Sequence, residues 1–418
     1  MKLSGSGRLV LACSASVALG LGMSSCGGGT IGYLWVLEGQ TAANSAGNTI
    51  TGYKIDNNSG NLTEIVHSPF TSGGSNPVMG VVRPGGRYVY VLNAGDATSS
   101  VAQFSVGGDG VLTFQQAFAS QGGTPQWMDI STGGDYLYVL DKVSPARNAL
   151  GVAPACTSAT GLSTAACGSV TVFAIDPDTG RLTLVQNQSI KVNGTYLTYT
   201  STGPAPTRIK NTAAGSVIIV NADQTVTSLQ VGTAGQLTVN ANSTQVIDLP
   251  PTVDNITSIT TGNNYLYLTD AANNRILQYT VSTTGVLQPV TGGIVANLVP
   301  NVTPVWTLTD SSSTKLYVLN QNNSSTTSPK SSISGYTIQT NGNLTPQSNN
   351  LNPYAVGSGP VCMVEDPSKQ WVYTSNQDGT VSGYHINHVE GTLNQLSRGS
   401  TFQAQGRPSC LIISGITS

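Results

Sequence analysis

Residues that could do chemistry are few and widely spaced in this 418-residue sequence. It has three histidines (His67, His385 and His388) and six cysteines, with no Cys-x-x-Cys pair, so no metal-ligand spacing occurs. There is no Gly-x-Ser-x-Gly elbow, P-loop or dinucleotide-binding fingerprint. Glycine-rich stretches such as 107–110 follow strands without opening a helix, which predicts hairpin turns. We therefore expect neither a metal nor a cofactor.

The amino terminus has the pattern of an export leader. Lys2 and Arg8 precede an apolar run, residues 9–21, that is too short to span a membrane permanently. Small residues then lead into Cys26 and a Gly-rich tether, residues 26–32, which resembles a bacterial lipoprotein lipobox. We expect residues 1–25 to be removed and Cys26 to be acylated. The lipid would anchor the exported protein to a membrane of the cell envelope, facing the periplasm or the cell surface.

The four cysteines after Cys26 form an even set, which is typical of disulfides in an oxidising compartment. Cys156 and Cys167 lie in one insertion and could close a short loop. Cys362 and Cys410 occupy equivalent places in the repeat described below. Bonding of this second pair depends on whether neighbouring strands bring the two Cα atoms within about 7 Å.

The composition excludes several classes of partner and fold. Only 9% of the residues are charged, and the formal net charge is −2. No basic stripe with interleaved aromatic residues occurs, so we expect no nucleic-acid partner. No helical periodicity of any length is visible. The polar residues are mainly Ser, Thr, Asn and Gln.

Positioning of any site depends on a repeat that is clearest between residues 77 and 118. Short β-branched and aromatic runs follow one another there, for example 87–93 and 100–106, and each is bounded by Gly, Pro, Asn, Asp or Ser. This pattern predicts four antiparallel strands joined by tight turns. A four-stranded unit of about 50 residues has the size of one propeller blade.

A fixed offset confirms that the unit is repeated. Thirteen residues after Pro77 comes Tyr90, and three further on comes Asn93. The same offsets recur in three clear copies and, in degenerate form, in two more: Pro125, Tyr138 and Asp141; Pro304, Tyr317 and Asn320; Pro360, Tyr373 and Asn376; Pro206, Ile219 and Ala222; Asp254, Tyr267 and Asp270. The Asn or Asp at the end is most simply a turn residue.

The copies predict an all-β, seven-bladed propeller over residues 33–418, with insertions near 142–169 and 321–332. The first blade lacks its innermost strand, since residues 33–38 match the second strand of the repeat. Residues 408–414 match the missing strand. We expect this carboxy-terminal strand to complete the first blade and close the ring, which leaves only short edges.

Tyr-Val-x-Asn stands at the end of the second strand, and Gly-x-Leu-Thr precedes the fourth at residues 60–63, 180–183 and 342–345. On these motifs rests a resemblance to the lactonase-type seven-bladed propellers, which include 6-phosphogluconolactonase and the YVTN-repeat surface proteins. It covers nearly the whole chain after the leader. It implies a ligand site at the mouth of the central channel where the inner strands begin.

The same resemblance implies Arg, His and an acid at that mouth, to activate water and stabilise an oxyanion. The family pattern of Pro-Arg-His followed by Asn-Glu is altered here: Pro206 is followed by Thr207 and Arg208, and the acid is Asp223. Asp223 as a base and Arg208 as an electrostatic stabiliser would be the catalytic pair. Alternatively, Arg208 pairs with nearby acids and Asp223 caps a turn.

Further binding candidates lie on the predicted inner strands near the channel mouth. Asp129 and Lys210 each follow their proline by four residues, which predicts an ion pair or a ligand clamp. Trp127 and Trp306, like Cys362 and Cys410, follow the repeat proline by two residues and so occupy equivalent places on their inner strands. They either pack between blades or form a stacking platform for a sugar. Gln126 takes the place of a family histidine.

Two functions follow. The first is a monomeric, exported binding or interaction module of the cell envelope, whose partner is a glycan, a protein or a small lactone. The second is a lactone hydrolase of the 6-phosphogluconolactonase type. The altered family motif favours the first.

Overall fold

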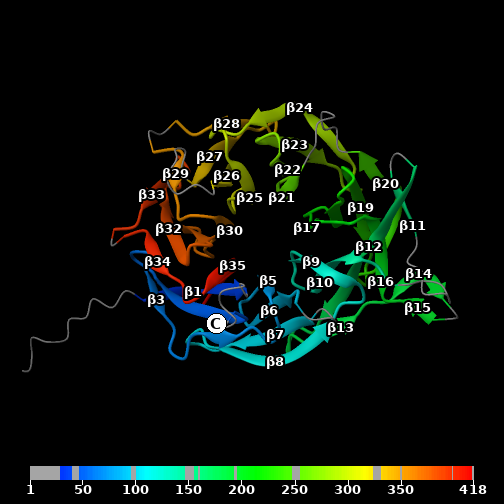
Figure 1. Ribbon diagram of the computed structural model, residues 1–418, viewed down its shortest axis with the longest axis horizontal. Coiled ribbons are helices and arrows are strands. Elements are labelled where there is room, and N and C mark those ends of the chain that lie inside the picture. Colours follow the sequence, from blue (N-terminus) through cyan, green and yellow to red (C-terminus); the bar gives the residue numbers. More distant parts are fainter. Residues whose placement is uncertain are drawn as a thin grey trace, which may run out of the picture.

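The computed structural model describes residues 29–39, 47–95, 100–145, 155–158, 161–192, 195–246, 255–322, 331–348, 351–397 and 399–416. Within these residues the fold is an all-β ring of seven antiparallel blades, each with four main strands (Figure 1). This confirms the predicted fold class. The predicted leader and Cys26 lie outside the described residues. No described segment is a helix long and apolar enough to cross a membrane.

Seven inner strands face the axis of the ring, one from each blade (Figure 1). The second blade follows the first along the chain, and so on around the ring. In order from the first blade these strands are β35 (Arg407–Gly415), β5 (Pro77–Val82), β9 (Gly123–Ile130), β17 (Arg208–Asn211), β21 (Ile256–Gly262), β25 (Thr303–Thr309) and β30 (Pro360–Glu365).

The remaining strands of each blade pair outward in sequence order. The second strands are β1 (Thr30–Gly39), β6 (Tyr88–Asn93), β10 (Tyr136–Val143), β18 (Ser216–Val220), β22 (Tyr265–Asp270), β26 (Lys315–Gln321) and β31 (Trp371–Asn376). The third strands are β2 (Thr49–Asp56), β7 (Ser100–Val106), β12 (Gly161–Ile175), β19 (Thr225–Val231), β23 (Arg275–Val281), β27 (Ser332–Ile338) and β32 (Thr380–Ile386). The outer strands are β3 (Leu62–Glu64), β8 (Leu112–Ala119), β13 (Leu182–Leu184), β20 (Leu237–Val246), β24 (Leu287–Ala296), β28 (Leu344–Pro346) and β33 (Leu393–Gln395).

Four blades add a second short outer segment to the third strand: β4 (Phe70–Thr71), β16 (Tyr199–Pro204), β29 (Tyr354–Ala355) and β34 (Thr401–Gln403). Within the first predicted insertion, β12 already begins at Gly161 and pairs with β11 (Ala155–Ser158). A hairpin of β14 (Asn187–Val192) and β15 (Thr195–Leu197) had no sequence signal that we recognised. Most of the second predicted insertion, residues 323–330, lies outside the described residues.

The ring closes as the sequence predicts. Strand β35 pairs with β1 in antiparallel register, so the first blade contains both ends of the propeller. A disulfide joins Cys362 on β30 to Cys410 on β35, with a Cα–Cα distance of 5.0 Å. The buried Glu38 carboxylate accepts hydrogen bonds from the backbone N–H groups of Gln405 (3.0 Å) and Gly406 (2.9 Å).

The tyrosine and glycine of the repeat meet between blades. Tyr90 in the second blade donates a hydrogen bond of 2.6 Å to the carbonyl of Gly180 in the third. Gly180 has φ +66°, and a Cβ there would lie 2.4 Å from the Tyr88 ring, so glycine is required. We call this contact the inter-blade latch. It also joins Trp35 to Gly110, Tyr267 to Gly342, Tyr317 to Gly391 and Tyr373 to Gly60.

The fourth blade departs from this pattern on both sides. The hydroxyl of Tyr138 in the third blade is buried and has no hydrogen-bond partner among the described residues, although Gly235 in the next blade keeps the repeat glycine. By strand register, the fourth blade has Ile218, opposite Lys210, where five other blades have tyrosine. The seams on either side of this blade therefore lack the described latch bond, and apolar packing contributes there, such as Tyr138 and Leu140 against Ile209.

Apolar cores lie between neighbouring blades, as the composition and repeat predict. One cluster joins residues of the fourth and fifth blades, including Ile218 and Leu268. Another surrounds the closing strand and contains Trp35, Leu411 and Ile412. Side chains alternate between the two faces of a blade along each strand. Because cores lie on both faces, the second strand of each blade, such as β6, is buried on both sides.

Candidate functional site

Strand register divides the inner side chains into two layers. The first layer, at the mouth where the inner strands begin, contains the residues paired opposite equivalent second-strand positions: Met79, Trp127, Arg208, Ser258, Trp306, Cys362 and Cys410. The second layer lies two residues further along: Val81, Asp129, Lys210, Thr260, Leu308, Val364 and Ile412.

The register corrects two positions of the predicted repeat. Asn221, rather than Ala222, ends the second strand of the fourth blade, because its Nδ2 donates to Thr225 and Thr227 Oγ1 (2.9 Å each) as Asn376 does to Thr380 and Ser382. The β17–β18 hairpin is shorter than its counterparts, so counting from Pro206 overshoots by one residue.

The fifth blade shows a similar slip. Asp254 lies outside the described residues, and Ile256 pairs with Asp270 as Pro77 pairs with Asn93. Because the β21–β22 hairpin closes at Gly262 and Tyr265, the offset from the repeat proline is two residues shorter there.

Two indole rings meet across the axis in the first layer. The Trp127 and Trp306 rings come from the third and sixth blades, which are not neighbours, and their centroids lie 5.3 Å apart. The Arg208 guanidinium covers the Trp127 ring, with Cζ 4.4 Å from the centroid. We call these three side chains the Trp–Arg plug. It favours the core-packing hypothesis for both tryptophans over the free stacking platform.

The described hydrogen bonds of Arg208 go to backbone carbonyls. Its Nε donates to Thr257 O at 2.7 Å and its Nη1 to Thr207 O at 2.8 Å. Burial lowers the pKa of Arg208 to about 10. The ion pairs between described residues are Lys210–Asp129 and Arg275–Asp270, so none of the described acids pairs with Arg208, and its expected pairing with an acid stays a prediction.

Asp223 caps a turn, and the seventh blade contains a copy of it. Asp223 Oδ1 accepts from the Thr225 N–H (3.2 Å) and hydroxyl (2.6 Å). Asp378 Oδ1 accepts in the same way from Thr380, at 3.1 and 2.6 Å. An acid that repeats in this way, without Arg208 as a partner, has the geometry of an Asx turn.

Gln126 at this mouth and two histidines elsewhere offer little chemistry. Gln126 donates to the nearby carbonyls of Thr124 and Pro125. His385 packs edge-on against Trp371 on the seventh blade, and His67 lies in an exposed turn with φ +69°. No described group of three His, Cys, Asp or Glu side chains could hold a metal ion.

The second layer contains the predicted ion pair. Lys210 Nζ lies 3.2 Å from Asp129 Oδ1, and the Asn211 backbone N–H donates to Asp129 Oδ2 at 2.7 Å. The side chains of Lys210 and Asp129 are 33% and 11% exposed, so the ammonium keeps access to solvent while the carboxylate is nearly enclosed. This pair joins the third blade to the fourth.

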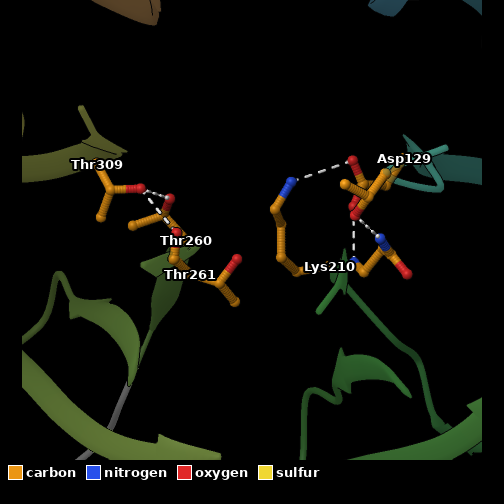
Figure 2. A network of polar contacts seen from close by, with 7 residues as sticks. Asp129, Lys210, Thr260, Thr261 and Thr309 are labelled. Carbon is orange, nitrogen blue, oxygen red and sulfur yellow. Dashed lines mark hydrogen bonds and ion pairs between the residues drawn. The ribbon is translucent and has the colours of Figure 1, made fainter. Parts of the chain in front are cut away.

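A cavity of about 470 Å³ opens beside this pair, at the mouth where the inner strands end. We call it the strand-end cavity. Figure 2 shows the ion pair on one side and three threonines from the fifth and sixth blades on the other. Thr309 Oγ1 donates to the carbonyl of Thr261 at 2.7 Å and lies 3.4 Å from Thr260 Oγ1. Ile130, Leu308 and Pro84 add apolar surface to the wall.

The threonines of this cavity were not predicted from the sequence. The signal was present in part, since a polar residue four positions after the repeat proline marked both Asp129 and Lys210. Thr260 belongs to the same layer, but the shorter hairpin of the fifth blade hid its equivalence.

The family comparison agrees with this architecture. The sequence profile of the family described as "Lactonase, 7-bladed beta-propeller" matches residues 47–153. This chain has the lactonase-type seven-bladed propeller fold. No curated protein sequence matches it.

Solved structures with the same fold include two bacterial lactonase-type propellers. The periplasmic gluconolactonase of Pseudomonas aeruginosa is 15% identical, with a TM-score of 0.67 over 93% of this chain and 100% of that one. A Bacteroides fragilis protein, provisionally identified as a 6-phosphogluconolactonase, is 14% identical, with a TM-score of 0.65 over 92% and 98%. At these identities the likeness extends to the fold.

The cysteine predictions have different outcomes. The bond between Cys362 and Cys410 is present. Cys167 is disulfide-bonded, whereas the side chain of Cys156 lies outside the described residues, so their pairing stays a prediction.

Proposed function

We propose that this chain is a binding module built on the lactonase-type propeller, and that it does not hydrolyse lactones at the mouth where the inner strands begin. The observation that carries the proposal is the Trp–Arg plug. Arg208 stacks on Trp127 and donates to two backbone carbonyls, which leaves it poorly placed to stabilise an oxyanion.

The acid of the altered motif supports the same proposal. Asp223 Oδ1 is engaged in a turn that Asp378 duplicates on the seventh blade, where the inner layer has no arginine. A general base needs a reacting proton within hydrogen-bond reach and a partner to orient it. The described contacts of Asp223 supply neither.

We further propose that the module is exported and anchored through a lipid on Cys26, with a glycan, protein or small lactone of the cell envelope as its partner. The leader pattern and the paired cysteines support this location. A radiolabelled palmitate incorporation assay on the full chain tests it: label is expected in the parent and lost in Cys26→Ala. Equal labelling of both chains would contradict the anchor.

Lactone hydrolysis is the second candidate function. It is favoured by the family match over residues 47–153 and by the shared fold with a periplasmic gluconolactonase. The test is hydrolysis of a panel of sugar and aliphatic lactones by the chain from Gly27 onward. We expect no turnover above the uncatalysed rate. Turnover that disappears in Arg208→Ala with Asp223→Asn would establish the hydrolase instead.

A further inference from the structure

We infer that the strand-end cavity is a binding site for a neutral sugar. This inference rests on the proposed binding function and assigns it a place and a ligand class. The cavity of about 470 Å³ falls within the range of small-molecule sites, and five consecutive blades, the second to the sixth, contribute its walls.

The paired charges favour a neutral ligand over an ion. Lys210 and Asp129 lie 3.2 Å apart, so an anion that approached the ammonium would also meet the carboxylate. A cation that approached the carboxylate would likewise meet the ammonium, which repels it. A hydroxyl group avoids both penalties, because it can donate to the carboxylate and accept from the ammonium.

The hydrogen-bonding capacity of the pair is only partly used. Within the described residues, Asp129 Oδ1 is the one acceptor bonded to Lys210 Nζ, and an ammonium has three donors. Adjacent hydroxyls on a sugar ring could therefore bridge Lys210 and Asp129 without breaking the ion pair. The carboxylate is fixed in place, since the Asn211 backbone N–H holds its second oxygen at 2.7 Å.

The opposite wall suits the same ligand class. Thr260, Thr261 and Thr309 present hydroxyl groups from the fifth and sixth blades (Figure 2). Ile130 and Leu308 add apolar side chains, which can cover the C–H face of a sugar ring. A wall with both characters fits a polyhydroxylated ring better than a purely polar ion or a purely apolar molecule.

The test is a titration of the isotope-labelled chain from Gly27 onward, followed by backbone amide chemical shifts. The probes are D-glucose, D-galactose and sodium D-gluconate at constant ionic strength. We expect at least one of the two sugars to shift the amides of Asn211, Thr261 and Thr309. We expect gluconate to bind at least about fivefold more weakly, because its carboxylate faces Asp129.

Two variants examine the walls separately. Asp129→Asn with Lys210→Gln keeps the side-chain sizes and removes both charges; we expect sugar affinity to fall at least about tenfold. Thr260→Val removes one hydroxyl at constant shape and should weaken binding about threefold. The matched control is Asp270→Asn with Arg275→Gln, which removes the other described ion pair away from the cavity and should leave affinity unchanged.

The inference is overturned if neither sugar shifts these amides, if the shifts gather at Gln126 and Thr207 instead, or if gluconate binds as tightly as the sugars. Unchanged affinity in the first double variant would also overturn it. Lactone turnover by the parent would overturn the proposed non-hydrolytic role while leaving sugar shifts at this cavity in place, so the two failures are distinguishable.

Discussion

At the residue scale, the clearest electrostatic effect is that on Asp141, the acid of the repeat in the second strand of the third blade. Asp141 is fully buried in the third blade and accepts hydrogen bonds from Ser120 (2.9 Å) and the Gly122 N–H (3.2 Å). No cation is bonded to it among the described residues. Burial is the main cause that raises the pKa of Asp141 to about 7, against donors that lower it.

Asp141→Asn should therefore change the pH dependence of stability. Between about pH 4 and pH 7 the folded parent keeps a proton that the unfolded chain has released, so the contribution of Asp141 to stability is lost as pH rises through 7. The Asn side chain does not titrate, so the variant does not lose stability in this way. Its free energy of unfolding relative to the parent should increase with pH, by up to about 4 kcal/mol between pH 4 and pH 8.

Urea unfolding of parent and variant at several pH values measures this trend. The converse control is Asn93→Asp, which places an acid at the equivalent buried position of the second blade and should be increasingly destabilising as pH rises. A constant difference between Asp141→Asn and the parent across this pH range would show that Asp141 is not protonated in the folded state.

A second prediction concerns the turn acids. Asp223→Ala and Asp378→Ala should each lower the free energy of unfolding by about 1 kcal/mol, because each removes the acceptor of one Asx turn. Asp223→Asn should restore most of that loss, since its amide oxygen can still accept. Chemical denaturation of the four chains decides the matter: a cost confined to one of the two alanine variants would contradict equivalent structural roles.

At the scale of elements, the inter-blade latch explains why tyrosine and glycine recur together. The hydroxyl of one second strand and the turn glycine of the next blade form one contact, so neither residue can change alone without loss. The contact at Tyr138 is incomplete, because its buried hydroxyl has no hydrogen-bond partner in the part of the chain that the structure describes. This gives a matched pair of otherwise equivalent tyrosines.

Tyr90→Phe should lower the free energy of unfolding by about 1–2 kcal/mol, because the Gly180 carbonyl loses its donor. Tyr138→Phe should be neutral or slightly stabilising, since it removes an unsatisfied buried hydroxyl. Urea midpoints of the two variants provide the comparison. Equal losses would mean that the latch bond contributes nothing beyond the shared packing of the ring.

The element scale also shows what sequence could and could not predict. Blade number and ring closure were predictable because proline, tyrosine and asparagine recur at local spacings that survive in most copies. Counting along the sequence placed Ala222 and Asp254 at the repeat positions that Asn221 and Ile256 occupy. A hairpin that is one or two residues shorter shifts every position counted from its start. The Trp127–Trp306 contact carries no local signal, since non-adjacent blades supply its two rings.

At the scale of the whole molecule, the closing strand joins the two ends of the propeller. Strand β35 places Leu411 and Ile412 against Trp35 in the core of the first blade. Truncation after Arg407 would expose that core and remove Cys410 and the ladder to β1. We expect the thermal midpoint of the whole domain to fall by more than about 10 °C.

Truncation after Gly415 is the control, because it leaves β35 intact and should not change the midpoint by more than about 2 °C. Calorimetry on both chains makes the comparison. An unchanged midpoint after loss of the strand would show that the ring does not depend on this closure.

The central claim is that this propeller is a binding module and that its plugged mouth does not hydrolyse lactones. One NMR time course tests this claim most directly. D-glucono-1,5-lactone is added to the labelled chain, and lactone decay is recorded together with the indole N–H signals of Trp127 and Trp306, assigned by Trp→Phe variants. We predict decay at the uncatalysed rate and unchanged indole signals, because the rings contact each other and Arg208. Accelerated decay with shifted indole signals would contradict the account and place a working active site at that mouth.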